Sequence, residues 1–262
     1  MSTAIALHQV NKVYANRTVA LQGIELTIRQ GEFVSLVGPS GCGKSTVLKL
    51  MAGLSMPTQG YLESPGVVGD RDLAFVFQDA ALMPWATVLE NVHLPLKLKG
   101  QSLRSSRSRI QAALNLVALQ GFEHSYPRQL SGGMKMRVSI ARALVTNPQV
   151  LLMDEPFGAL DEMSRSRLNG DLLKLWEQYH WTVVFVTHNI YEAVYLSNRV
   201  VIMGAQPGRI VAEVPIAVPY PRDADFRTSP QFNQYCREIT HQLSAVTATA
   251  PPLTTPPSRM AP

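Results

Sequence analysis

The chain has 262 residues, of which 46% are hydrophobic and 16% charged, and its formal net charge is +5. This composition is typical of a folded globular protein with a sizeable core, and no run of the sequence approaches the roughly 18 uncharged apolar residues that a membrane span needs. The chain starts without the pattern of a signal peptide and has too few cysteines for a disulfide framework, so we expect a reducing cytoplasm.

The first 28 residues predict two β-strands. Apolar residues alternate with polar ones in two runs, around residues 5–10 and over 21–28, as in half-buried strands. Tyr14 falls in the turn between the two runs. From its position alone we interpret Tyr14 as an ordinary half-buried tyrosine.

The next stretch predicts a phosphate-binding loop. Residues 34–37 read as a buried strand and 47–52 as a helix. Between them the pattern G-x-x-x-x-G-K-[ST] is matched by Gly38, Pro39, Ser40, Gly41, Cys42, Gly43, Lys44, Ser45 and Thr46. Glycines let successive N–H groups turn toward one anion, and the start of the helix adds its positive end. Lys44 is a cation for the outer phosphates, and the Ser45 hydroxyl is a ligand for Mg²⁺. The stretch therefore predicts a nucleotide phosphate site.

A further buried strand is predicted over residues 73–77 and is followed by the polar amide of Gln78. We expect this strand to lie beside the strand of the phosphate loop, from where Gln78 can reach the metal and the terminal phosphate. A hinge or a strand cap is an equally good interpretation of Gln78.

Residues 87–147 change character and predict a helical subdomain inserted into an α/β core. A short segment, 90–98, is interrupted by a proline, and 104–119 has apolar residues at helical spacing. Ser131, Gly132 and Gly133 open a further helix, 134–144, and make either a second anion cradle or a plain N-cap. The basic residues at 97–109 have no interleaved aromatic residues, so we interpret them as a solvated face and expect no nucleic-acid partner.

Two later strands end in groups that can do chemistry. Residues 150–155 predict a strand that ends in Asp154, suited to hold Mg²⁺ through its water shell, and Glu155, suited to act on the attacking water. After Asp161 and a helix over 162–179, a strand over 182–187 is followed by His188. Ligands of open α/β sheets bind at the carboxyl ends of strands, so these groups are expected to converge. A hairpin at 200–214 and a disordered Pro- and Thr-rich tail at 245–262 complete the prediction.

The ordered set of motifs resembles the ATP-binding-cassette (ABC) ATPases over about residues 4–215. The resemblance implies a P-loop NTPase core of mixed, mainly parallel sheet with an antiparallel β subdomain (1–86 and 148–244) and a helical subdomain (87–147). It implies that Tyr14 stacks on adenine, Gln78 forms the Q-loop, Ser131 to Gly133 belong to the signature motif, Asp161 ends the D-loop and His188 senses the γ-phosphate. Met134 departs from the usual glutamine of that signature.

The resemblance also implies partners. In a two-fold dimer, with itself or with a paralogue, each Ser131 cradle faces the Lys44 of the other chain and two ATP molecules are bound between them. Shorter segments, 83–92 and 203–210, resemble the nitrate, sulfonate, taurine and bicarbonate importers. They imply a membrane permease, a periplasmic or lipid-anchored substrate-binding protein, and a peripheral place on the cytoplasmic face of the inner membrane. Trp85 and Met83 are candidate anchors for the permease, or alternatively part of the subdomain core.

Two other classes compete with transport. A soluble cassette ATPase acting on nucleic acid or the ribosome usually has two cassettes or a long coiled coil, neither of which this sequence contains. A P-loop kinase for a small molecule needs neither the Ser131 cradle nor His188.

Overall fold

The computed structural model describes residues 2–64 and 73–248. Its strands form a three-stranded antiparallel sheet in the order β2-β1-β4 and a six-stranded sheet in the order β5-β6-β7-β3-β8-β9. The strands are β1 (Thr3–Val13), β2 (Val19–Arg29), β3 (Phe33–Val37), β4 (Gln59–Glu63), β5 (Leu73–Val76), β6 (Val150–Asp154), β7 (Thr182–Val186), β8 (Arg199–Gly204) and β9 (Arg209–Pro215). The α/β fold with a mixed, mainly parallel sheet and an antiparallel sheet agrees with the sequence prediction.

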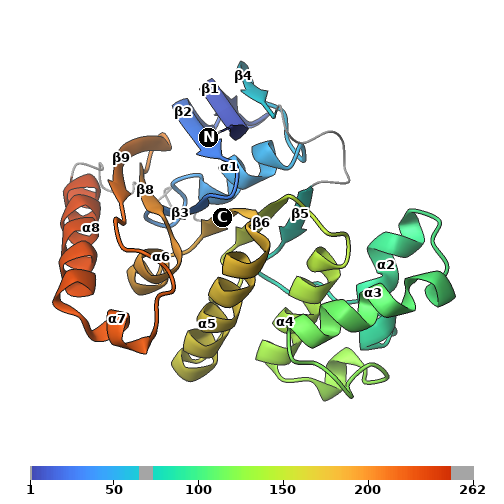
Figure 1. Cartoon of the computed structure of the whole chain (residues 1–262). Helices are drawn as coiled ribbons and strands as arrows, with labels where there is room; N and C mark the ends of the chain where they lie inside the picture. The colour runs from blue at the N-terminus through green and yellow to red at the C-terminus, as the bar shows by residue number, and fades with distance from the viewer. Residues whose placement is uncertain (1, 65–72, 249–262) are drawn as a thin grey trace, which may run out of the picture.

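The large sheet is buried on both faces at its centre. Strands β3 and β7 are apolar almost throughout, and every residue of both is buried, as expected where helices or a second sheet cover each face of a parallel sheet. On one face, α1 (Lys44–Met51) lies between the large sheet and the antiparallel sheet, and the other face carries α5 (Glu162–Tyr179) and α6 (Ile190–Leu196) (Figure 1). The parallel register brings the carboxyl ends of β3, β6 and β7 to the same edge.

The helical region lies at one end of the molecule (Figure 1). It contains α2 (Val88–Leu98), α3 (Leu103–Leu116), a short 3-10 turn (Pro127–Gln129) and α4 (Gly132–Leu144). The interruption predicted at the proline is absent, because α2 continues through Pro95. Helix α4 starts at Gly132, two residues before the predicted start, because the Ser131 hydroxyl accepts a hydrogen bond from the N–H of Met134 and caps it.

One predicted neighbour relation is wrong. Strand β5 does not lie beside the phosphate-loop strand β3, because β6 and β7 stand between them. Strand β5 is an edge strand of four residues that pairs with β6. Gln78 therefore approaches the phosphate loop from the far side of the strand that carries Asp154 and Glu155.

Three C-terminal helices have no counterpart in the sequence prediction. They are α6, α7 (Ala224–Thr228) and α8 (Pro230–Ala248), and α8 packs against α6, β8 and β9. The tail predicted to begin at residue 245 overlaps the end of α8, and its remainder, 249–262, lies outside the described residues.

Candidate functional site

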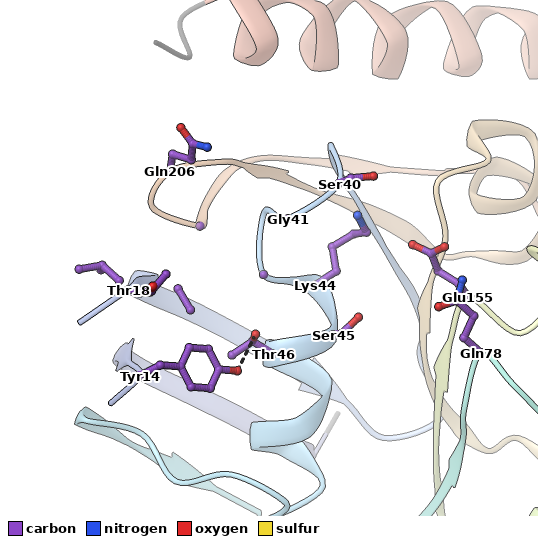
Figure 2. A pocket seen from close by; sticks show the side chains of 14 residues that line it. Tyr14, Thr18, Ser40, Gly41, Lys44, Ser45, Thr46, Gln78, Glu155 and Gln206 are labelled. Carbon is purple, nitrogen blue, oxygen red and sulfur yellow. Dashed lines mark hydrogen bonds between the residues drawn. The ribbon is translucent and has the colours of Figure 1, made fainter. Parts of the chain in front are cut away.

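The phosphate loop connects β3 to α1 and has the backbone that its glycines predict. Gly41 and Gly43 have φ angles of 77° and 94°, in the left-handed region that side chains disfavour. A Cβ on Gly38 would lie 2.5 Å from the carbonyl oxygen of Met203, so the loop can approach β8 only with glycine there. The loop thereby opens toward a hollow at the carboxyl edge of the sheet (Figure 2).

The Lys44 side chain lies across this loop. Its Nζ donates hydrogen bonds to the carbonyl oxygens of Gly38 at 2.8 Å and Pro39 at 3.1 Å, and only 6% of the residue is exposed. Nζ also lies 3.9 Å from Sγ of Cys42, and among the described residues no carboxylate forms an ion pair with it. Lys44 is therefore available to an anion that enters the loop.

A cavity of about 580 Å³ surrounds the loop, a size that suits a small organic ligand. It is lined by Tyr14, Thr18, Val19, Ala20, Ser40, Gly41, Gly43, Lys44, Ser45, Thr46, Gln78, Glu155, Gln206 and Gly208. Figure 2 shows Tyr14 and Thr18 on one side of the loop and Gln78 and Glu155 on the other, with Lys44 between them. The Tyr14 hydroxyl lies 3.2 Å from Oγ1 of Thr46, and 40% of Tyr14 is exposed, which leaves its ring open to the cavity.

Ser45 and Asp154 form the oxygen pair expected of a magnesium site. The Ser45 hydroxyl donates to Oδ1 of Asp154 at 2.8 Å, and burial raises the pKa of the Asp154 carboxyl. No cluster of three or more acidic, His or Cys side chains that could hold a metal ion occurs among the described residues. One hydroxyl and one carboxylate beside a phosphate loop nevertheless fit Mg²⁺, which takes few protein ligands and completes its shell with water and phosphate oxygens.

Glu155 and His188 meet at the same edge. Nδ1 of His188 lies 3.1 Å from Oε2 of Glu155, and the two residues follow neighbouring strands, β6 and β7. Glu155 has a φ angle of 45°, an uncommon conformation for a residue with a side chain. Such local strain is concentrated at functional sites, and here it turns the carboxylate into the cavity.

The remaining predicted site residues lie outside the cavity lining. Ser131 and Gly132 are exposed at the start of α4, and Asp161 is exposed at the start of α5, where its carboxylate accepts from the N–H of Ser164. Gly38, Pro39 and Cys42 do not line the cavity either. The Cys42 thiol faces the core, and burial raises its pKa. The thiol of Cys42 is therefore part of the core beneath the loop.

The sequence prediction missed several lining residues. Thr18, Val19 and Ala20 come from the start of β2, and Gln206 and Gly208 from the turn between β8 and β9. Gly208 donates its N–H to the carbonyl oxygen of Ala20 at 3.1 Å, which ties that turn to β2. No local pattern marks these residues, because they join the cavity only through contacts between distant segments.

The fold and this site together define a P-loop nucleotide-binding domain, and comparisons with known proteins specify it further. The chain matches the ABC transporter family over residues 21–158. An uncharacterized ABC transporter ATP-binding protein of Methanocaldococcus jannaschii is 45% identical over 93% of this chain and 92% of that protein. The aliphatic sulfonates import ATP-binding protein SsuB of Bacillus cereus is 42% identical over 91% of this chain and 95% of that protein.

Solved structures of ABC transporter proteins are also similar to this chain. The dimeric structure of MJ0796, a bacterial ABC transporter cassette, is similar with a TM-score of 0.72 and 38% identity, over 82% of this chain and all of that chain. A post-hydrolysis structure of the same cassette with ADP and Pi gives a TM-score of 0.73 and 37% identity. The cbiO1 protein of Clostridium perfringens, part of an ABC transporter complex, gives 0.75 and 27% over 82% of this chain and 90% of that chain.

The chain therefore belongs to the ABC transporter family, as one of its ATP-binding, ATP-hydrolysing subunits. These findings do not favour the kinase or the soluble nucleic-acid ATPase. Among the described residues, no helix has the length and apolar character to cross a membrane.

Proposed function

We propose that the chain is the ATPase of an importer for a small anion of the nitrate, sulfonate, taurine or bicarbonate type. The observation that carries the ATPase mechanism is the division of the site, whereas the anion class rests on relatives named for sulfonate import. The cavity contains Lys44, Gln78 and Glu155, whereas the Ser131 cradle and Asp161 are exposed outside it. The Lys44 cavity of one subunit and the Ser131 cradle of another complete each other when a second copy or a paralogue places its cradle against this cavity. Two-fold symmetry forms both such sites at once.

In this dimer each residue has a defined task. Tyr14 stacks on the adenine ring, and the loop N–H groups and Lys44 bind the phosphates. Glu155 orients a water molecule and accepts its proton as the bond between the β-phosphate oxygen and the γ-phosphorus breaks. His188, held 3.1 Å from Glu155, contacts the γ-phosphate, and Gln78 approaches from the opposite side. ATP favours the closed dimer through contacts that its γ-phosphate makes only there, and hydrolysis removes them.

Ser45, Asp154 and Gln78 are the residues that would hold Mg²⁺. When bound, the ion neutralises charge on the β- and γ-phosphate oxygens. The Ser45 hydroxyl, which donates to Asp154 at 2.8 Å, and the Asp154 carboxylate at the end of β6 would each offer the ion an oxygen atom.

The surface beside α2 suits the permease. Trp85 is 76% exposed and borders a cavity of about 520 Å³, also lined by Met83, His93 and Leu103. The buried Asn91 side chain holds the Trp85 loop, since it accepts from the N–H of Met83 and donates to three carbonyl oxygens in residues 83–87. A preformed loop with an exposed aromatic residue is a typical anchor for a protein partner. We place the protein accordingly at the cytoplasmic face of the inner membrane, with a substrate-binding protein on the other side.

The importer class rests on relatives named for sulfonate import and on segments 83–92 and 203–210. Reconstitution of the chain with its permease and binding protein tests it, by measuring which anion stimulates ATP turnover. We expect stimulation by one small oxyanion; stimulation by a sugar or a metal chelate alone would contradict the class.

The catalytic assignment is tested by Glu155→Gln. This variant keeps the ATP contacts but loses the proton acceptor, so we expect turnover to fall by at least about 100-fold. ATP, but not ADP, should then shift the chain from monomer to dimer in size-exclusion chromatography. Normal turnover in the variant would remove Glu155 from the mechanism, and full turnover by a chain held monomeric would remove the dimer.

A further inference from the structure

A buried polar network underlies the Glu155–His188 pair, on residues that the mechanism above does not use. Its centre is Glu192 on α6, which is 6% exposed. Its Oε2 accepts from the hydroxyl of Thr187 at 2.5 Å. Its Oε1 accepts from Nδ2 of Asn169 at 3.4 Å and lies 3.7 Å from Nε of Arg165. Each of these partners can donate a hydrogen bond to the carboxylate, while burial raises the pKa of Glu192 above its ordinary value.

One side of the network fastens the segment before α5. Besides its contact with Glu192, the Arg165 guanidinium donates hydrogen bonds to the carbonyl oxygens of Leu160 at 2.8 Å and Phe157 at 3.4 Å. It also donates to the carboxylate of Glu162 at 2.9 Å. Its planar fork therefore spans the residues that lead from Glu155 to Asp161. Because Arg165 is only 17% exposed, this attachment is largely shielded from water.

The other side of the network fastens the turn that carries His188. The Thr187 hydroxyl donates to Glu192 and also accepts from the N–H of Asn189 at 2.9 Å, so it bonds on both sides of His188. The network also includes Gly158, whose N–H donates to the carbonyl oxygen of Glu155 at 3.1 Å. A Cβ on Gly158 would lie 3.6 Å from Cε1 of His188, so that segment passes close to the imidazole.

We propose that Arg165 and Glu192 are positioning residues for His188. They hold the imidazole against Glu155 and transmit to it any displacement of the Asp161 segment. The inference rests on the proposed function in one respect, that the partner subunit contacts this segment when the dimer closes. Closure would then press on Arg165 and Glu192 and, through them, on the turn that carries His188.

The test is Glu192→Gln, which keeps the volume but presents an amide to the donors Arg165 and Asn169. A misplacement of His188 of about 1 Å costs roughly 100-fold in rate. We expect kcat for ATP to fall about 10- to 100-fold while KM changes less than about threefold. Glu32→Gln is the matched control, because Glu32 pairs with an equally shielded Arg199 at 2.7 Å outside this network. A wild-type kcat in Glu192→Gln, or an equal loss in Glu32→Gln, would overturn the proposal.

A double-mutant cycle separates positioning from general damage. If Glu192 acts only through His188, Glu192→Gln should cost almost nothing further in a His188→Ala background. Additive losses would overturn the positioning role. Full activity of His188→Ala alone would instead remove His188 from the proposed mechanism and this inference with it, so the two failures are distinguishable.

A second pair of variants keeps the test decisive if Glu192→Gln fails to fold. Thr187→Val removes the hydroxyl with almost the same shape and should reproduce the loss in kcat. Thr187→Ser restores the hydroxyl and should recover most of the rate. Loss of activity in both variants to the same extent would assign Thr187 a packing role and overturn the proposal that Arg165 and Glu192 position His188.

Discussion

The partly buried carboxylate of Asp154 suits metal binding but lowers the stability of the metal-free protein. Burial raises its pKa above the ordinary value of 3.8, so the folded state disfavours the ionised carboxylate. The resulting cost is absent below pH 3.8, grows as the pH rises through the folded-state pKa, and is fully present at neutral pH. In the absence of a metal ion, the ionised Asp154 carboxylate therefore lowers the free energy of unfolding of the protein.

We therefore expect Asp154→Asn to raise the melting temperature of the metal-free protein at pH 7, while ATP turnover falls by about 100-fold as the ion is lost. Differential scanning calorimetry of the metal-free protein measures the first effect, and a phosphate-release assay with Mg²⁺ and ATP measures the second. Asp171→Asn is the control with the opposite sign, since Asp171 pairs with Arg137 at 2.7 Å and should lose up to about 1 kcal/mol. A lower melting temperature in Asp154→Asn would contradict this account.

At the scale of single elements, the start of α2 is closed by a reciprocal cap. The Glu90 carboxylate accepts from the N–H of Thr87 at 2.7 Å, and the N–H of Glu90 donates to the Thr87 hydroxyl at 3.3 Å. The bond from the Thr87 backbone, and next a bond from the Thr87 hydroxyl to the same carboxylate at 2.9 Å, lower the pKa of Glu90. The cap fixes where α2 begins and so where the Trp85 loop ends.

The cap predicts a defined pH dependence. A carboxyl with a lowered folded-state pKa adds stability above its ordinary value of 4.5, and this stability is lost as the pH falls through the folded-state pKa. The melting temperature of the natural chain should therefore fall more steeply below pH 4.5 than that of Glu90→Gln. Thr87→Ala should cost about 1 kcal/mol at pH 7. Equal slopes for the natural chain and Glu90→Gln would show that Glu90 contributes nothing at this end.

At the scale of the whole molecule, the exposed Trp85 is separated from the nucleotide cavity. It contributes little to the fold because 76% of it is exposed, yet it borders a surface cavity formed by α2 and the start of α3. The nucleotide cavity and this surface cavity share no lining residue. Binding of a permease and hydrolysis of ATP are therefore expected to respond to different substitutions.

Trp85→Ala tests this separation. We expect the isolated chain to keep its melting temperature and its basal turnover. Its affinity for the permease should fall by about 30-fold, equivalent to about 2 kcal/mol for a central anchor. Leu54→Ala, which changes a 61% exposed apolar residue after α1, should leave that affinity unchanged. Equal effects of the two substitutions in a pull-down with detergent-solubilised permease would refute the docking surface.

The sequence alone determined the phosphate loop, the strands of the sheet core and the long helix 162–179. These depend on neighbouring residues: glycines that permit a tight turn, apolar runs that predict buried strands, and regular spacing along a helix. The same local logic identified the pair Asp154 and Glu155, because a strand end and its next residues are adjacent in the chain.

Only the tertiary structure decided the rest. The edge position of β5, the place of Gln206 in the cavity and the contact of Arg165 with Glu192 each join segments far apart in the chain. A short stretch of sequence does not predict which distant segments become neighbours, because strand order and side-chain contacts depend on the packing of the complete core. The sequence thus specified the chemical groups, and packing decided which of them meet.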